Sequence, residues 1–170
     1  MSETRKEFFA RLAREHYTLL VPDMCPIQFH LMSKIIELDG MRLKIISPLG
    51  REAKDSGLSV VHNDACYPVV IVAGAFINEL RSGDYDLSKT AVIISQTGGG
   101  CRASNYLSLF KKAFAKEFPQ VPVISLNFSG LEKERSLPFT LSRARMMLAG
   151  LMYGDMLMNL VYQSETYYHK

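Results

Sequence analysis

Short apolar runs alternate along the chain with longer segments in which apolar residues recur every three or four positions. The short runs are rich in valine, isoleucine and leucine, which is typical of buried strands. The longer segments are typical of helices that bury one face. The predicted strands cover residues 17–22, 41–48, 58–61, 89–94 and 123–127, and the predicted helices cover residues 2–16, 27–38, 50–57, 66–80, 105–117 and 140–162.

This order of elements predicts an α/β fold. Strands that alternate with helices at such spacing indicate right-handed crossovers and a parallel sheet. We expect an open doubly wound (Rossmann- or flavodoxin-like), mostly parallel sheet of about four strands with helices on both faces. Because 170 residues suit a single core, we predict one domain over 1–170. Its expected parts are an N-terminal helix in 1–16, a sheet core in 17–139 and a C-terminal helix in 140–165.

A glycine-rich turn, Ser-Gln-Thr-Gly-Gly-Gly-Cys-Arg-Ala at 95–103, separates the central predicted strand from the next helix. Three consecutive glycines remove the Cβ atoms that would keep a ligand from the backbone. The unpaired first amides of the following helix favour the thiolate form of Cys101. The turn matches neither the nucleotide P-loop nor the Gly-x-Gly-x-x-Gly motif, so the chain shows no nucleotide motif. The candidate cofactor-binding residues are Gly98, Gly99, Gly100 and Arg102.

All three cysteines fall where a predicted strand gives way to a helix. Cys25 follows the first strand, Cys66 follows the short strand at 58–61, and Cys101 follows the central strand. Ligands of doubly wound folds bind at the carboxyl ends of the strands, so these positions predict a shared site at one edge of the sheet. Cysteines that serve only packing are more often buried as small hydrophobic side chains.

Thiolates at such a site select iron–sulfur clusters, zinc or copper(I). The closely spaced C-x-x-C or H-x-x-x-H pairs of most zinc sites are absent from the sequence, although His62 precedes Cys66 by four residues. Cluster ligands can come from separate loops, and glycine amides can donate hydrogen bonds to the sulfides. The predicted metal ligands are Cys66, Cys101 and Cys25.

Composition limits where the protein is expected to be located and which partners it is expected to bind. The net charge of +3 without a basic stripe does not indicate nucleic acid, and no apolar run is long enough to cross a bilayer. Three widely spaced cysteines without a secretory signal predict a cytoplasmic protein without disulfides. The methionines near the C-terminus are expected to pack against the sheet or a partner.

Three segments carry a family resemblance: 63–68 (NDACYP), 95–106 (SQTGGGCRASNY) and 121–127 (VPVISLN). They resemble the carboxy-terminal domain of the large fused 2-hydroxyacyl-CoA dehydratase activase proteins, relatives of the 2-hydroxyglutaryl-CoA dehydratase activator. The resemblance runs from about residue 17 to residue 162. It matches Cys66 and Cys101 to the cysteine motifs of the family. Cys25 lies in a segment similar to the Pro-x-Met-x-Pro loop of the family and is a further candidate ligand.

This resemblance implies an anaerobic system in which ATP hydrolysis drives electrons to a low-potential cluster, of 4Fe-4S type or larger. The cluster would serve reductive or dehydrating chemistry on a substrate such as an acyl-CoA. The ATPase modules of the family have no counterpart in these 170 residues. The implied partners are therefore ATPase activator domains or subunits and further dehydratase-like domains. The chain alone is not expected to complete a catalytic cycle.

Two other functions remain open. The chain could be a non-catalytic α/β module that holds a nucleotide, CoA or a protein partner at Gly98–Gly100. It could also be a thiol enzyme with Cys101 as the nucleophile, for which neither His30 nor His62 can be assigned as the base from spacing alone. Replacing Cys101 with serine separates the binding module from the cluster-binding domain, since ligand binding would survive the change and cluster chemistry would not.

Overall fold

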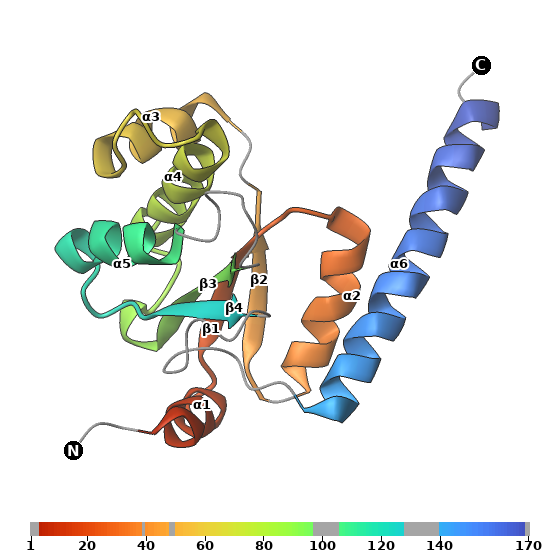
Figure 1. The fold of residues 1–170 in the computed structure, drawn as a ribbon, viewed down its shortest axis with the longest axis horizontal. Helices are drawn as coiled ribbons and strands as arrows, with labels where there is room; N and C mark the ends of the chain where they lie inside the picture. Colours follow the sequence, from red (N-terminus) through yellow and green to blue (C-terminus); the bar gives the residue numbers. More distant parts are fainter. Residues whose placement is uncertain (1–3, 39, 48–49, 97–105, 128–139, 169–170) are drawn as a thin grey trace.

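The structure, a computed structural model, describes residues 4–38, 40–47, 50–96, 106–127 and 140–168. Four parallel strands form one sheet in the order β2-β1-β3-β4 (Figure 1). The strands are β1 (Thr18–Pro22), β2 (Arg42–Ile46), β3 (Thr90–Gln96) and β4 (Val123–Asn127). The α-helices are α1 (Arg5–Arg14), α2 (Pro26–Glu37), α3 (Arg51–Val60), α4 (Tyr67–Arg81), α5 (Tyr106–Glu117) and α6 (Leu141–Tyr168), and the short 3₁₀ helix η1 covers Leu87–Lys89.

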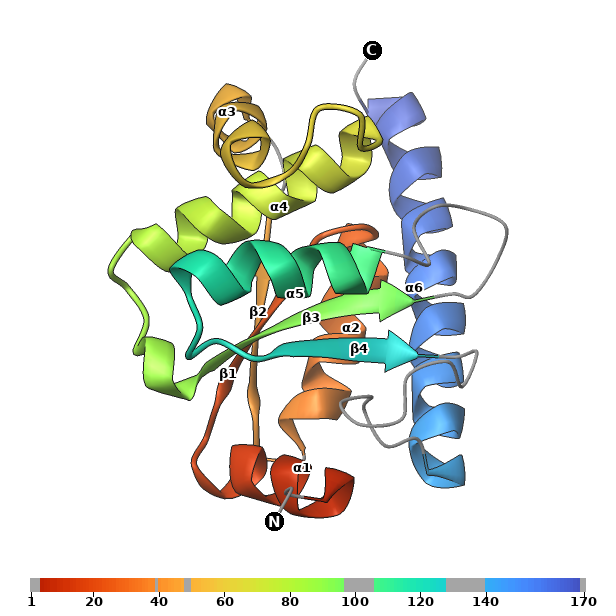
Figure 2. The same ribbon diagram turned by 60° about the vertical axis from the view of Figure 1, so that its left-hand side comes forward.

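Helices cover both faces of the sheet (Figures 1 and 2). In β1, Leu19 and Val21 join the core formed with α1 and α2, whereas Leu20 joins the core formed with α4 and α5. All three side chains are buried, as expected for a central parallel strand. The predicted doubly wound α/β fold with a parallel sheet is therefore confirmed.

The strand order places the reversal of winding between β1 and β3. Thr18 of β1 pairs with Arg42 of β2 on one side and with Thr90 of β3 on the other. In doubly wound folds the ligand crevice opens at this reversal, beyond the carboxyl ends of the two strands. The loop after β1 carries Cys25, and the glycine-rich turn follows β3.

The prediction of a strand at 58–61 is wrong. Leu58 and Val60 belong to the last turns of α3, and Val61 is the extended residue that ends this helix. Ala53 and Gly57 bury the face of α3 that packs against α4, so the helical periodicity continues into the apolar run. A run of only four residues, of which three are apolar, does not distinguish a strand from the end of a helix. Cys66 consequently lies on a helix-to-helix turn and not on a strand-to-helix loop.

Helices α3 and α4 approach each other backbone to backbone. A Cβ atom added at Gly74 would lie 1.6 Å from the carbonyl oxygen of Ala53, and one added at Gly57 would lie 1.9 Å from that of Val70. Only glycine permits these two contacts, because real Cβ atoms do not come within such distances of backbone oxygens. The pair of glycines thus sets the position of the α3–α4 hairpin.

An aromatic cluster fixes α4 against α5. The rings of Phe110 and Phe114 lie 6.0 and 6.1 Å from the ring of Phe76 in edge-to-face geometry. All three side chains are fully buried. Edge-to-face pairs of this kind add to the free energy of burial. The cluster therefore fixes how α4, which begins directly after Cys66, packs against α5.

Helix α6 packs mainly against α2 and extends beyond it (Figure 1). Gly154 allows the close approach, since an added Cβ would lie 2.7 Å from Cγ of Gln28. The Gln28 amide also donates a hydrogen bond of 2.7 Å to Oδ1 of Asp155. The methionine-rich segment is expected from the sequence to pack against the sheet or a partner. Met147 packs against the core on the α1 and α2 side of the sheet, whereas Met152 and Met156 are exposed. Among the described helices, none combines the length and apolar character needed to cross a membrane.

Asp86 stabilises the turn into β3 in a pH-dependent way. The hydroxyl and the amide of Ser88 donate hydrogen bonds of 2.6 and 3.0 Å to Oδ1 of Asp86, and they hold the pKa of this carboxyl below its ordinary value of 3.8. A lowered pKa in the folded state stabilises the fold above pH 3.8, and this contribution is lost as the pH falls through the folded-state value. We expect Asp86→Ala to lower the urea midpoint at pH 7 and to lower it less at pH 2.5. An equal difference at both pH values would contradict this role.

Candidate functional site

The carboxyl edge of the sheet is the place where the sequence predicts a site. After β1, Cys25 forms the N-cap of α2 and is followed by Pro26 at the first helical position. The Cys25 carbonyl accepts a hydrogen bond of 2.8 Å from the Phe29 amide, whereas its side chain makes no capping hydrogen bond. The exposed Cys25 thiol is thus accessible at this edge.

Cys66 occupies the same kind of position on the opposite face of the sheet. It is the N-cap of α4, its carbonyl accepts a hydrogen bond of 3.0 Å from the Val69 amide, and Pro68 belongs to the first turn. Figure 2 shows that α4 begins on the side toward which β3 and β4 point. The Cys66 side chain is half-buried and packs against the core between α4 and α5.

The Cys66 thiol is hydrogen-bonded to the hydroxyl of Tyr106, the first residue of α5. The glycine-rich turn connects β3 to α5, so Cys66 lies against the point where this turn enters the helix. Tyr106 follows Cys101 by five positions in the sequence, and chain connectivity alone limits their Cα–Cα distance to about 17 Å. The described residues therefore bring Cys66 to the helical end of the turn that contains Cys101.

Sequence reasoning assigned no role to Tyr106, although the residue closes the 95–106 segment. Its contact with Cys66 depends on the packing of α4 against α5, which no local pattern reveals. The remaining predicted site residues, Gly98, Gly99, Gly100, Cys101 and Arg102, lie outside the described residues. The convergence of the Cys66 and Cys101 thiols consequently stays a prediction.

Asp23 adds a polar group at the end of β1. Its amide donates a hydrogen bond of 2.8 Å to the Ile46 carbonyl, which ties it to the end of β2. Its Oδ1 atom is buried and has no hydrogen-bond partner within the part of the chain that the structure describes. Buried acceptors are normally satisfied, so this oxygen is available to accept a hydrogen bond from a ligand. The sequence analysis did not single out Asp23.

His62 does not act as a partner of the cysteine. Its Nδ1 lies 3.2 Å from Oδ2 of Asp64, and the two side chains are 75% and 87% exposed. Within the described ranges, no three His, Cys, Asp or Glu side chains come together in a way that could hold a metal ion. A mixed site of His62 and Cys66 is thus not formed by the residues that the structure places.

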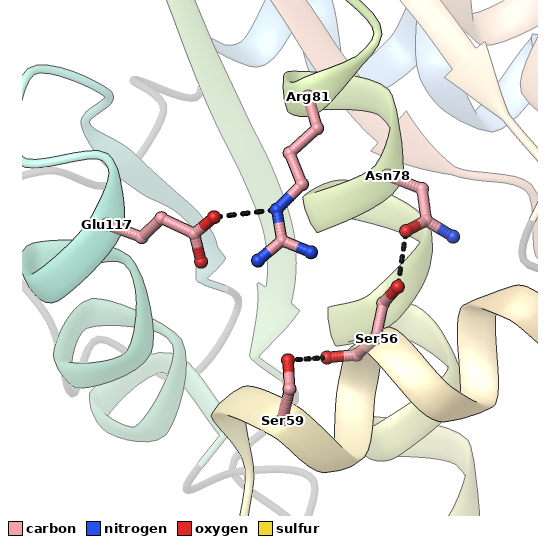
Figure 3. Close-up of polar contacts among 5 residues, drawn as sticks. All are labelled: Ser56, Ser59, Asn78, Arg81 and Glu117. Atoms are coloured by element: carbon pink, nitrogen blue, oxygen red, sulfur yellow. Dashed lines mark hydrogen bonds and ion pairs between the residues drawn. The ribbon is translucent and has the colours of Figure 1, made fainter.

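A groove of about 810 Å³ lies between α3, α4 and α5, and neither Cys25 nor Cys66 lines it. In Figure 3 Arg81, the last residue of α4, donates a hydrogen bond of 2.7 Å to Glu117, the last residue of α5. Ser56 of α3 donates a hydrogen bond to Asn78 of α4, and the Ser59 hydroxyl donates one of 2.6 Å to the Ser56 carbonyl. Arg81 and Glu117 end the helices whose first turns hold Cys66 and Tyr106, so the groove is not the predicted thiol site.

The chain folds as a doubly wound α/β domain, and cysteines stand at the N-termini of helices on both faces of its sheet. Comparisons with known protein families, with curated proteins and with solved structures found no match for this chain. The resemblance of the three sequence segments to the dehydratase activase proteins therefore stays a prediction. The Cys66 thiol, hydrogen-bonded to the Tyr106 hydroxyl, is compatible with a cluster ligand.

Proposed function

We propose that this chain is the iron–sulfur-cluster-binding domain or subunit of an ATP-driven 2-hydroxyacyl-CoA dehydratase or reductase-type system. The observation that carries the proposal is the hydrogen bond between Cys66 and Tyr106. It joins Cys66, at the start of α4, to the first residue of the helix that follows the glycine-rich turn in the sequence.

The residues of this edge suit a cluster by the chemistry of their donors. Cys66 and Cys101 would supply thiolate ligands, and the exposed Cys25 is a further ligand candidate. The Tyr106 hydroxyl is hydrogen-bonded to the Cys66 sulfur. Hydrogen bonds to a ligand sulfur stabilise the reduced form of a cluster. The amides of Gly98 to Gly100 would donate further hydrogen bonds. The bound cluster would supply one-electron transfer.

The proposed partners follow from the same resemblance. ATPase activator domains or subunits would deliver electrons, and further dehydratase-like domains would complete the site for an acyl-CoA or a similar small substrate. The proposed location is the cytoplasm of an anaerobic cell, where free thiols and an oxygen-sensitive cluster persist. The thiol-enzyme alternative gains no support from His62, because this imidazole pairs with Asp64 at the surface.

Anaerobic purification with analysis of iron and acid-labile sulfide tests the proposal. We expect a brown protein that binds iron and sulfide in equal amounts and gives an electron paramagnetic resonance signal in one redox state. The measurement is made on the chain alone and on its complex with partner subunits, because a cluster shared across an interface is lost on separation. A colourless, iron-free protein in both samples, with Cys66 and Cys101 reduced and intact, would contradict the proposal.

A further inference from the structure

Helix α6 carries an unusually apolar exposed surface. Between Met146 and Ser164 its only charged residue is Asp155, and this carboxylate accepts the hydrogen bond from Gln28 of α2. Twelve large apolar side chains on the described part of α6 are between 38% and 81% exposed. Side chains of this size and exposure present on the order of 1,000 Å² together, more than the largest apolar patch of a typical monomer. Such a surface indicates an interface.

Five exposed side chains of α6 form a regular seam on a face that α2 does not cover. Gly150 and Gly154 pack against Ile35 and Gln28 of α2. The residues of the seam are Met146, Ala149, Tyr153, Met156 and Leu160, and all five are exposed. Their spacing of three, four, three and four positions is the heptad spacing of a coiled-coil seam.

We propose that this seam pairs with the same seam of a second copy of the chain, in antiparallel orientation about a two-fold axis between Tyr153 and Met156. A pair along the seam would bury part of this apolar surface and so contribute to the roughly 800 Å² that each partner buries in a standard interface. The near absence of charge between Met146 and Ser164 removes repulsion between identical surfaces. It also disfavours a lipid surface, because helices that lie on membranes carry Lys and Arg on their polar face.

Side-chain sizes along the seam favour the antiparallel orientation. About the proposed axis, Tyr153 faces Met156 of the second copy, and Ala149 faces Leu160, so small residues meet large ones. A methionine sulfur beside an aromatic ring is a favourable contact. In a parallel pair each residue would meet itself, which would leave a gap at Ala149 and place two Tyr153 rings at one level. The seam is therefore self-complementary only in the antiparallel pair.

Sedimentation equilibrium of the full chain tests the proposal. We expect a dimer at micromolar concentration, and we expect Met156→Glu to weaken the dimer by at least about 30-fold, because the carboxylate would be buried against an apolar partner. The matched control is Leu58→Glu on α3, since Leu58 is 45% exposed and Met156 is 51% exposed. Circular dichroism verifies the fold of each variant. A wild-type chain that stays monomeric, or a dimer that Met156→Glu does not weaken relative to Leu58→Glu, would overturn the proposal.

A charge-pair experiment tests the orientation. Tyr153→Lys and Met156→Glu are each expected to weaken the dimer, and the double variant is expected to recover at least half of the lost association free energy. Recovery follows because the new ammonium and carboxylate groups face each other across the antiparallel axis. In a parallel pair each new charge would meet its own copy, so the double variant would stay as weak as the single variants and would exclude the antiparallel arrangement.

Discussion

Gly74→Ala is expected to lower the free energy of unfolding by about 3 kcal/mol, the upper range for overpacking a tight contact. The new Cβ atom would lie 1.6 Å from the Ala53 carbonyl oxygen and 2.7 Å from the Gly57 amide nitrogen. These are backbone atoms of α3, so no rotation of a side chain can relieve the overlap. Helices α3 and α4 must move apart, and the apolar contacts between them are lost. Urea denaturation at pH 7 measures the effect.

Gly150→Ala is the matched control for this change. It makes the same substitution inside a helix, but its Cβ atom would lie 3.5 Å from Cδ1 of Ile35, an ordinary contact distance. Alanine also favours the helix by up to about 1 kcal/mol relative to glycine. The control should therefore be neutral or stabilising. If Gly74→Ala unfolds at the same urea concentration as the wild type, this result would contradict the close approach of α3 to α4.

Replacing either proposed cluster ligand is expected to remove most of the bound iron. Serine is nearly the same size as cysteine, but its hydroxyl is a poor ligand for iron in a cluster, which prefers soft thiolates. We therefore expect Cys66→Ser and Cys101→Ser to lower the iron content per chain by at least about tenfold. The half-buried position of Cys66 tolerates the hydroxyl, because Tyr106 can hydrogen-bond to it. Iron and sulfide analysis after anaerobic reconstitution measures the loss.

Cys25→Ser is the comparison for these two variants. Cys25 is exposed at the start of α2, and the sequence resemblance matches only Cys66 and Cys101 to cysteine motifs. We expect Cys25→Ser to keep more iron than either of the other variants. Equal iron in Cys66→Ser and the wild type, with the fold intact, would remove Cys66 from the site.

The fold could be predicted from the sequence where the periodicity was long enough to be unambiguous. The helix of α4 carries buried residues from Val69 to Leu80 at helical spacing, and the strands β1 and β3 are continuous apolar runs between polar boundaries. The four residues at 58–61 gave no such signal, and the close contacts of α3 with Gly74, which Ala53 and Gly57 make, involve another element of the fold.

The candidate site was predictable only in outline. The rule that ligands bind beyond the carboxyl ends of parallel strands applies to Cys25, which follows β1, but it does not account for Cys66, because the element before Cys66 is the helix α3. The neighbour of Cys66, Tyr106, depends on the way three phenylalanines set α4 on α5. The exposed seam of α6 likewise follows from the narrow contact of that helix with α2, which the methionine content alone does not indicate.

The most direct test of the account is whether the Cys66 and Cys101 thiols converge in the iron-free protein. A short bifunctional thiol reagent, which joins only sulfur atoms a few ångströms apart, is applied to the reduced Cys25→Ser chain under anaerobic conditions. We predict one intramolecular bridge between Cys66 and Cys101, found by mass spectrometry in native buffer and lost in urea. Two separately modified cysteines without a bridge, in a protein that is folded throughout the reaction, would contradict the proposed cluster site.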